Sequence, residues 1–160
     1  MIYYEKQNIR ARDARKEDID QLVNKLRKTD IEQFWNTHHL GPLEALRFAF
    51  ENSTFCASLE LDGEVIAVCG MSPDTIIGNN ASIWLIATDR ISEIKLSFLR
   101  LCHFFISKMQ ESYSNLYNFV DAKNLRYIKW LETCGAKVHP ENVDYGEEQE
   151  PFCFFTFGVN

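Results

Sequence analysis

Histidine and cysteine are the first candidates for chemistry in this sequence, because both bind metals and take part in catalysis. His38 and His39 are neighbours, but adjacent residues on a helix do not share a face, and no third ligand stands at metal-site spacing. No CxxC or Cys/His spacing typical of zinc joins the five cysteines, which are Cys56, Cys69, Cys102, Cys134 and Cys153. The sequence therefore predicts no metal site and reduced, buried thiols.

Three further side chains could react but have a plainer interpretation. Cys134, beside Gly135, could be a thiol nucleophile, yet the sequence shows no activating partner. His103 lies inside a long helical pattern, which favours a flanking position over that of a general base. Asp89 directly follows an apolar run, so it could act as a carboxylate base, a turn residue or a helix cap.

The clearest structural unit runs from residue 115 to residue 138. A buried strand is expected at Leu116–Ala122, followed by a helix that begins at Asn124, whose side chain is a good N-cap. Gly135 can take the left-handed conformation that ends a helix, and a further strand follows it. Such a unit needs a sheet to pack against.

The remaining elements follow from apolar periodicity and turn residues. Helices are expected from Lys16, over a short segment with Ile31, Phe34 and Trp35, from Pro42, and over 92–109. Strands are expected at 9–14, 55–61, 65–71, 81–88 and 152–158, with Asp62-Gly63 as a hairpin turn. This order predicts one α+β domain over residues 1–160, with a mixed, mostly antiparallel sheet of about six to seven strands and about four helices.

Composition limits the partners. The chain has 160 residues, of which 46% are hydrophobic and 25% charged, as in an ordinary globular domain. Its net charge of −6 argues against general binding to nucleic acid or to an anionic membrane. No leader-like N-terminus and no apolar run of about 18 residues is visible, so we expect a soluble, intracellular protein.

The element order and three local patterns resemble the GNAT (N-acetyltransferase) superfamily across essentially the whole chain. The patterns are IRARDARKEDIDQL near the N-terminus, the hairpin segment DGEVIAVCG, and Asn124 with Ile128 and Gly135. The resemblance implies a GNAT-like fold whose fourth and fifth strands splay apart to receive the pantetheine of acetyl-CoA.

A narrower resemblance covers about two thirds of the chain. The segments LRKTDIEQFW, SIWLIATDRI, LSFLR, NFVDAKN and IKWLETCGA are similar to the small acetyltransferase-like proteins of short-tailed bacteriophages. That family is associated with virion morphogenesis and internal virion components. The resemblance implies a phage or host protein as partner, and the host cytoplasm or the virion as location.

The GNAT resemblance also implies a cofactor site, on which this sequence departs from the family pattern. The backbone of Ile86, Ala87 and Thr88, the segment Arg90, Ile91 and Ser92, and Asn124 would hold acetyl-CoA. Arg90 matches the first position of the pyrophosphate motif, but its two glycine positions hold Glu93 and Lys95. Glycine lets the backbone approach the phosphates closely, and Glu93 brings a negative charge instead.

The catalytic residues that the resemblance implies are also incomplete. The family's tyrosine acid falls on Leu131, which cannot donate a proton. Tyr127, one turn earlier on the same face, is a weak substitute and could equally be a core residue. Asp89 is the nearest carboxylate to the fourth strand.

Two functions remain open on the sequence. One is an acetyl-CoA-dependent N-acyltransferase that modifies an amine on a small molecule or a protein. The other, which the missing glycines and Leu131 favour, is a virion-associated or accessory binding protein with a degenerate acetyl-CoA site. A phage-encoded modifier or blocker of a host defence protein fits the same residues.

Overall fold

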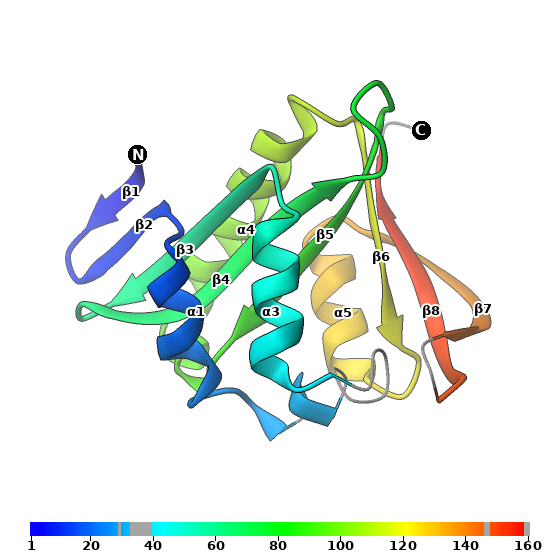
Figure 1. The fold of residues 1–160 in the computed structure, drawn as a ribbon, viewed down its shortest axis with the longest axis horizontal. Helices are drawn as coiled ribbons and strands as arrows, with labels where there is room; N and C mark the ends of the chain where they lie inside the picture. Colours follow the sequence, from blue (N-terminus) through cyan, green and yellow to red (C-terminus); the bar gives the residue numbers. More distant parts are fainter. Residues whose placement is uncertain (29, 33–39, 146–147, 159–160) are drawn as a thin grey trace.

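The centre of the molecule is an eight-stranded sheet in the order β1-β2-β3-β4-β5-β6-β8-β7 (Figure 1). The computed structural model describes residues 1–28, 30–32, 40–145 and 148–158. The strands are β1 (Ile2–Lys6), β2 (Ile9–Asp13), β3 (Phe55–Leu61), β4 (Glu64–Pro73), β5 (Asn80–Ala87), β6 (Asn115–Asp121), β7 (Lys137–Tyr145) and β8 (Glu150–Phe157). All neighbouring strands are antiparallel except β5 and β6, which are parallel.

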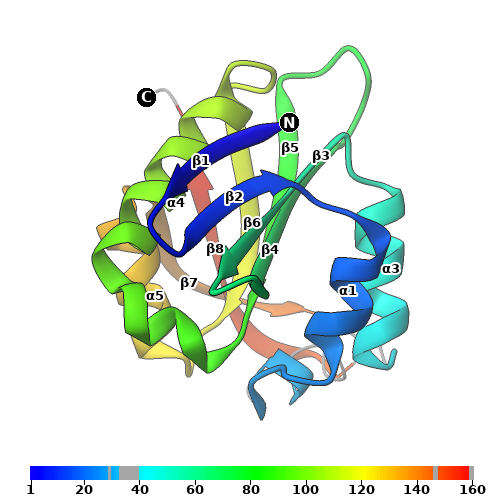
Figure 2. The same cartoon turned by 90° about the vertical axis from the view of Figure 1, so that its left-hand side faces the viewer.

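Helices cover both faces of this sheet (Figure 2). On one face lie α1 (Lys16–Val23) and α3 (Pro42–Glu51), and on the other lie α4 (Lys95–Gln110) and α5 (Leu125–Thr133). A 3₁₀ helix, η1 (Asp89–Ile94), leads from β5 into α4. Each face has its own apolar core, so the predicted α+β, GNAT-like architecture is confirmed.

Local signals in the sequence account for several element boundaries. Asp62 and Gly63 both have positive φ, as a tight hairpin turn requires, and they connect β3 to β4. The side chain of Asn124 accepts the backbone N–H of Tyr127 at 3.1 Å and so caps α5. Gly135 ends that helix at φ 96°.

The structure differs from the prediction in the number and length of strands. The described residues form a sheet of eight strands, not six to seven. β1, which is short and mostly exposed, has no clear signal in the sequence. The acidic, polar segment Glu141–Glu150 predicts a loop, but β7 continues into it as far as Tyr145. Pro140 argues against a strand at this position, because proline has no backbone N–H to donate. It is tolerated here because β7 is an edge strand whose pairing register shifts between Val138 and Asn142.

The helix expected over 92–109 also begins differently. α4 starts at Lys95, and the preceding turns are η1. Ile91 and Ile94 both pack against the core from η1, and their three-residue spacing matches the three residues per turn of a 3₁₀ helix. Of the short helix expected near residue 31, residues 28 and 30–32 are helical, and Phe34, Trp35, His38 and His39 lie outside the described residues.

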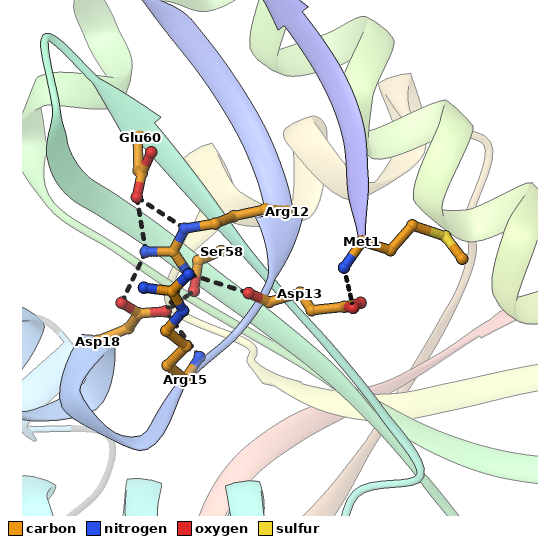
Figure 3. A network of polar contacts seen from close by, with 7 residues as sticks. All are labelled: Met1, Arg12, Asp13, Arg15, Asp18, Ser58 and Glu60. Carbon is orange, nitrogen blue, oxygen red and sulfur yellow. Dashed lines mark hydrogen bonds and ion pairs between the residues drawn. The ribbon is translucent and has the colours of Figure 1, made fainter.

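A buried ion pair joins β2 to α1 (Figure 3). The guanidinium of Arg12 donates two hydrogen bonds to Asp18, at 2.7 and 2.9 Å, and a third to Glu60 at 2.8 Å. Asp18 also accepts hydrogen bonds from the Ser58 hydroxyl and the Arg15 backbone N–H. Arg12 and Asp18 are only 7% and 2% exposed, so this pair fixes the helix to the sheet inside the protein.

Acid is expected to weaken this connection. Burial alone would raise the pKa of Asp18, but the hydrogen bonds from Arg12, Ser58 and Arg15 outweigh it and hold the pKa below its usual value. The stabilisation is therefore complete above the unfolded pKa of about 4 and is lost as pH falls through the lower folded pKa. In urea unfolding at several pH values, the free-energy difference between wild type and Asp18→Asn should be constant above pH about 5 and narrow below about 4. A difference that does not change with pH would contradict this assignment.

Candidate functional site

The two central strands separate along most of their length. β5 and β6 pair only between Asn80–Ser82 and Asn115–Tyr117. In Figure 1 they meet near the end of the molecule that carries the C-terminus and then diverge, with α5 behind the gap. β5 remains paired with β4 as far as Ala87, and β6 remains paired with β8 as far as Asp121. β5 and β6 correspond to the fourth and fifth strands of a GNAT-like sheet, and they diverge as the resemblance implies.

Asn118 stands where the strands part. Its Nδ2 donates to the backbone carbonyl of Ile83 on β5 at 2.6 Å, and its Oδ1 accepts the backbone N–H of Phe119 at 2.7 Å. The side-chain amide of Asn118 thus bonds a carbonyl of β5 and an N–H of β6, in place of the next backbone hydrogen bonds between the two strands. Sequence reasoning missed this residue, although a polar Asn in the apolar run LYNFV is a visible signal.

Replacing Asn118 with Leu is expected to lower the free energy of unfolding by about 1–3 kcal/mol, because a partly buried carbonyl and N–H lose these hydrogen bonds. Asn118→Asp keeps an acceptor for Phe119 but loses the donor to Ile83, so its loss should be intermediate. Urea unfolding measures both. Asn115→Ala, which removes an exposed hydrogen bond to Asn80 at 3.0 Å, is the control and should change stability by about 0.5 kcal/mol or less.

A cavity of about 620 Å³ occupies the gap. Ile83 and Leu85 line it together with residues of the α4 and α5 face, and Trp84 and Ile86 line it together with residues of the α3 face. The cavity therefore reaches both faces of the sheet. Its walls are mainly apolar, with aromatic contributions from Phe48, Phe98, Phe105, Phe119, Trp84 and Trp130.

The polar groups of the cavity come from elements far apart in the sequence. Tyr127 of α5 lines it, and burial raises the pKa of its phenol. Asp30 lines it as well and accepts two hydrogen bonds from Arg27, at 2.8 and 3.1 Å. Burial raises the pKa of Asp30 despite this ion pair, and the negative charge of Asp89 adds to the effect. The structure thus brings Tyr127 and Asp89, the two weak catalytic candidates, to the same region as Asp30, which the sequence did not single out.

Cys134 has a neighbour that the sequence did not reveal. It lines the cavity together with Cys102 of α4. A hydrogen bond between the two thiols, together with burial, raises the pKa of Cys102. All five cysteines are free thiols in the structure.

Arg90, the residue expected at the pyrophosphate, is held by carboxylates. Its guanidinium binds Glu64 at 2.7 Å, Asp62 at 3.0 Å and Glu93 at 3.0 Å. Hydrogen bonds to Glu93, Glu64 and Asp62 raise its pKa. Glu64 also binds Lys25 of the segment after α1. Five charged groups thus meet at the start of η1, three of them negative.

The other expected cofactor residues surround this network. Ile86, Ala87 and Thr88 are buried at the end of β5, and Ile91 and Ser92 lie in η1 with Ser92 exposed. The Oγ1 of Thr88 is buried and has no hydrogen-bond partner among the described residues. The side chain of Asn124 is engaged in capping α5, and Leu131 is buried against the core on the same helix. Binding of acetyl-CoA by these residues remains a prediction.

Two negative observations accompany this geometry. Within the described ranges, no cluster of three or more His, Cys, Asp or Glu side chains could hold a metal ion. Among those same residues, no helix has the length and apolar character needed to cross a bilayer.

Several solved structures that superpose on this chain are named as acetyltransferases. A GCN5-related N-acetyltransferase from Kribbella flavida superposes with a TM-score of 0.71 at 16% identity, covering 95% of this chain and 98% of that one. The ribosomal-protein-S5-alanine acetyltransferase from Vibrio fischeri gives 0.68 at 12% identity, covering 96% and 94%. A spermidine N-acetyltransferase from Vibrio cholerae, solved with CoA and spermine, gives 0.65 at 12% identity, covering 94% and 95%. The protein has the GNAT acetyltransferase fold.

Sequence comparison identifies the family within that fold. A family model described as "Bacteriophage T7, probable scaffold protein Gp13" matches residues 56–143. The probable scaffold protein gp13 of Escherichia phage T7 is 29% identical over 135 residues, which cover 79% of this chain and 92% of that protein. The chain belongs to the family of phage T7 probable scaffold protein Gp13. The resemblance to phage acetyltransferase-like proteins is confirmed.

Proposed function

We propose that this GNAT-fold phage protein is a binding protein of virion assembly, associated with the virion or accessory to it, whose acetyl-CoA site is degenerate. Its family supports the phage context, because the T7 relative is described as a probable scaffold protein. Its partner is a phage or host protein, and it acts in the host cytoplasm or inside the particle.

The observation that carries this proposal is the carboxylate network around Arg90. In GNAT enzymes the residues before the long helix hold the pyrophosphate of acetyl-CoA, so this position must attract an anion. Here Asp62, Glu64 and Glu93 bind the guanidinium of Arg90, and Lys25 is the one further cation that the described residues add to this network. A pyrophosphate would have to displace these carboxylates and would be repelled by them. The residues present therefore do not fit the group.

The residues at the position of the expected catalytic acid support the same conclusion. Leu131 stands where the family has its tyrosine acid, and it is buried against the core. Tyr127 lies at the cavity, and burial raises its pKa, which makes it a weaker acid than an exposed tyrosine.

The proposal predicts that acetyl-CoA leaves the thermal stability unchanged. A ligand at 100 times its dissociation constant would add about 2.7 kcal/mol to the folded state, which thermal unfolding detects easily. The melting temperature of wild type should not change with millimolar acetyl-CoA. Glu93→Gly removes one carboxylate and lets the backbone approach the phosphates, so acetyl-CoA should raise the melting temperature of this variant more than that of wild type. A clear shift of wild type that Arg90→Ala abolishes would overturn the proposal. Detection of the protein in purified particles by mass spectrometry tests the virion assignment separately.

An active N-acyltransferase is the second candidate, and two observations favour it. The cavity between β5 and β6 is open where the thioester would lie, and the Oγ1 of Thr88 lacks a partner within the described ranges at the end of β5. This candidate requires release of free CoA from acetyl-CoA in the presence of an amine such as spermidine, and a lower rate for Tyr127→Phe. Absence of CoA release at millimolar acetyl-CoA would exclude it.

A further inference from the structure

We propose that the gap between β5 and β6 binds an extended peptide segment of the partner protein, paired with the backbone of β5 and carrying a basic residue toward Asp30. This inference rests on the proposed function, because it names the class of partner that a non-enzymatic protein would bind at this position. Its support comes from the backbone, the walls and the charge of the gap.

The backbone of β5 has hydrogen-bonding groups directed into the gap. In a strand, the N–H and C=O of one residue point to the same side, and those of the next residue point to the opposite side. The Ile83 carbonyl faces β6, because the side chain of Asn118 donates a hydrogen bond to it. Leu85 and Ala87 therefore direct their N–H and C=O groups to the same side. The ladder with β6 ends at Ser82, and no other backbone partner of Leu85 or Ala87 on that side occurs among the described residues. An added strand would satisfy these groups, as in peptide binding by β-augmentation.

The walls of the gap suit a strand better than a compact ligand. Successive side chains of an inserted strand would point to opposite faces of the sheet. Apolar surface is present on both faces, from Phe98 and Trp130 on one and from Phe48 and Ile86 on the other. A peptide with apolar residues at neighbouring positions could place one on each side.

The charge of the gap favours a basic residue. Asp30 and Asp89 are close enough for their charges to interact, and Arg27 is the ion-pair partner of Asp30. Among the described residues, these two carboxylates and one guanidinium carry a net negative charge beside the apolar cavity. A lysine or arginine of the peptide would compensate it, whereas a neutral apolar ligand would not, and a polyanion such as CoA would be repelled by it.

The test begins with a displayed library of random heptapeptides selected on the purified protein. An enriched peptide is synthesised with a fluorescein label, and its affinity is measured by fluorescence anisotropy. Enriched sequences should combine apolar residues with a lysine or arginine. Replacing alternate backbone N–H groups of the peptide with N-methyl groups should weaken binding at least tenfold, because the side chains stay while the pairing is lost.

Two protein variants and one NMR measurement locate the peptide. Asp30→Asn should weaken binding about tenfold, whereas Asp20→Asn on the exposed side of α1 should leave it unchanged. By hydrogen exchange, the amides of Leu85 and Ala87 should exchange fast in the free protein and slow at least tenfold in the complex. The amides of Trp84 and Ile86, which face β4, should be protected in both states and serve as internal controls.

Each contrary result overturns the proposal. These results are the absence of any enriched peptide, equal affinity of the N-methylated peptide, or protection elsewhere with no change at Leu85 and Ala87. Failure here is separable from failure of the proposed function, which the acetyl-CoA experiment measures on its own. If the protein binds neither acetyl-CoA nor peptide, only the peptide site is refuted. If it binds acetyl-CoA, the proposal of a degenerate cofactor site is refuted, whether or not a peptide binds.

Discussion

Replacing Asp18 with alanine is expected to lower the free energy of unfolding by about 3–5 kcal/mol, because it breaks a buried ion pair. The reason is that Arg12, 7% exposed, would keep its charge inside the protein with Glu60 as its remaining carboxylate partner. The hydroxyl of Ser58 and the backbone N–H of Arg15 would lose their acceptor at the same time. Urea unfolding monitored by circular dichroism measures the loss.

An exposed ion pair between α1 and α3 is the matched control. Asp20 and Arg47 bind at 2.8 Å with about half of each side chain exposed, and such pairs contribute roughly 0–1 kcal/mol. Asp20→Ala should therefore change stability little. The double variant Arg12→Met/Asp18→Leu, which removes both buried charges, should recover part of the stability lost in Asp18→Ala. A cost of Asp18→Ala no greater than that of Asp20→Ala would show that the buried pair does not act as described.

Replacing Gly70 with valine is expected to cost about 3 kcal/mol, at the upper end for overpacking of a core. A Cβ built on Gly70 would lie 2.4 Å from Cε2 of the Trp84 ring, far inside van der Waals contact. The ring has little freedom to move, because its Nε1 donates a hydrogen bond to the Ser53 hydroxyl at 2.9 Å. Thermal or urea unfolding measures the loss.

A second substitution separates this collision from a general effect on the strand. Trp84→Leu removes the ring, so Gly70→Val should cost clearly less in the Trp84→Leu background than in wild type. Equal costs in the two backgrounds would place the strain elsewhere. Because Trp84 lines the cavity, the same pair of variants also reports how firmly the wall of the gap is held.

The site was predicted less completely than the fold, and Arg90 shows why. The sequence placed this residue between the central strand and the long helix, and the structure has it there, in the 3₁₀ helix η1. It could not show that Asp62 and Glu64, almost thirty residues earlier, contact the same guanidinium. Their positions depend on the β3–β4 hairpin lying beside η1, which no local pattern encodes. Asp30 and Tyr127 are a similar case, because they are far apart in the sequence and line the same cavity.

By itself, the sequence determined the order of the elements from β2 onward, the Asp62-Gly63 turn, the Asn124 cap and the family. Each of these depends on residues within a few positions or on a matched pattern. Only the tertiary structure decided the eighth strand, the end of pairing at Asn118 and the carboxylates around Arg90. These features depend on which strands become neighbours and in which register. That choice is made by the packing of the whole sheet between its two helical layers.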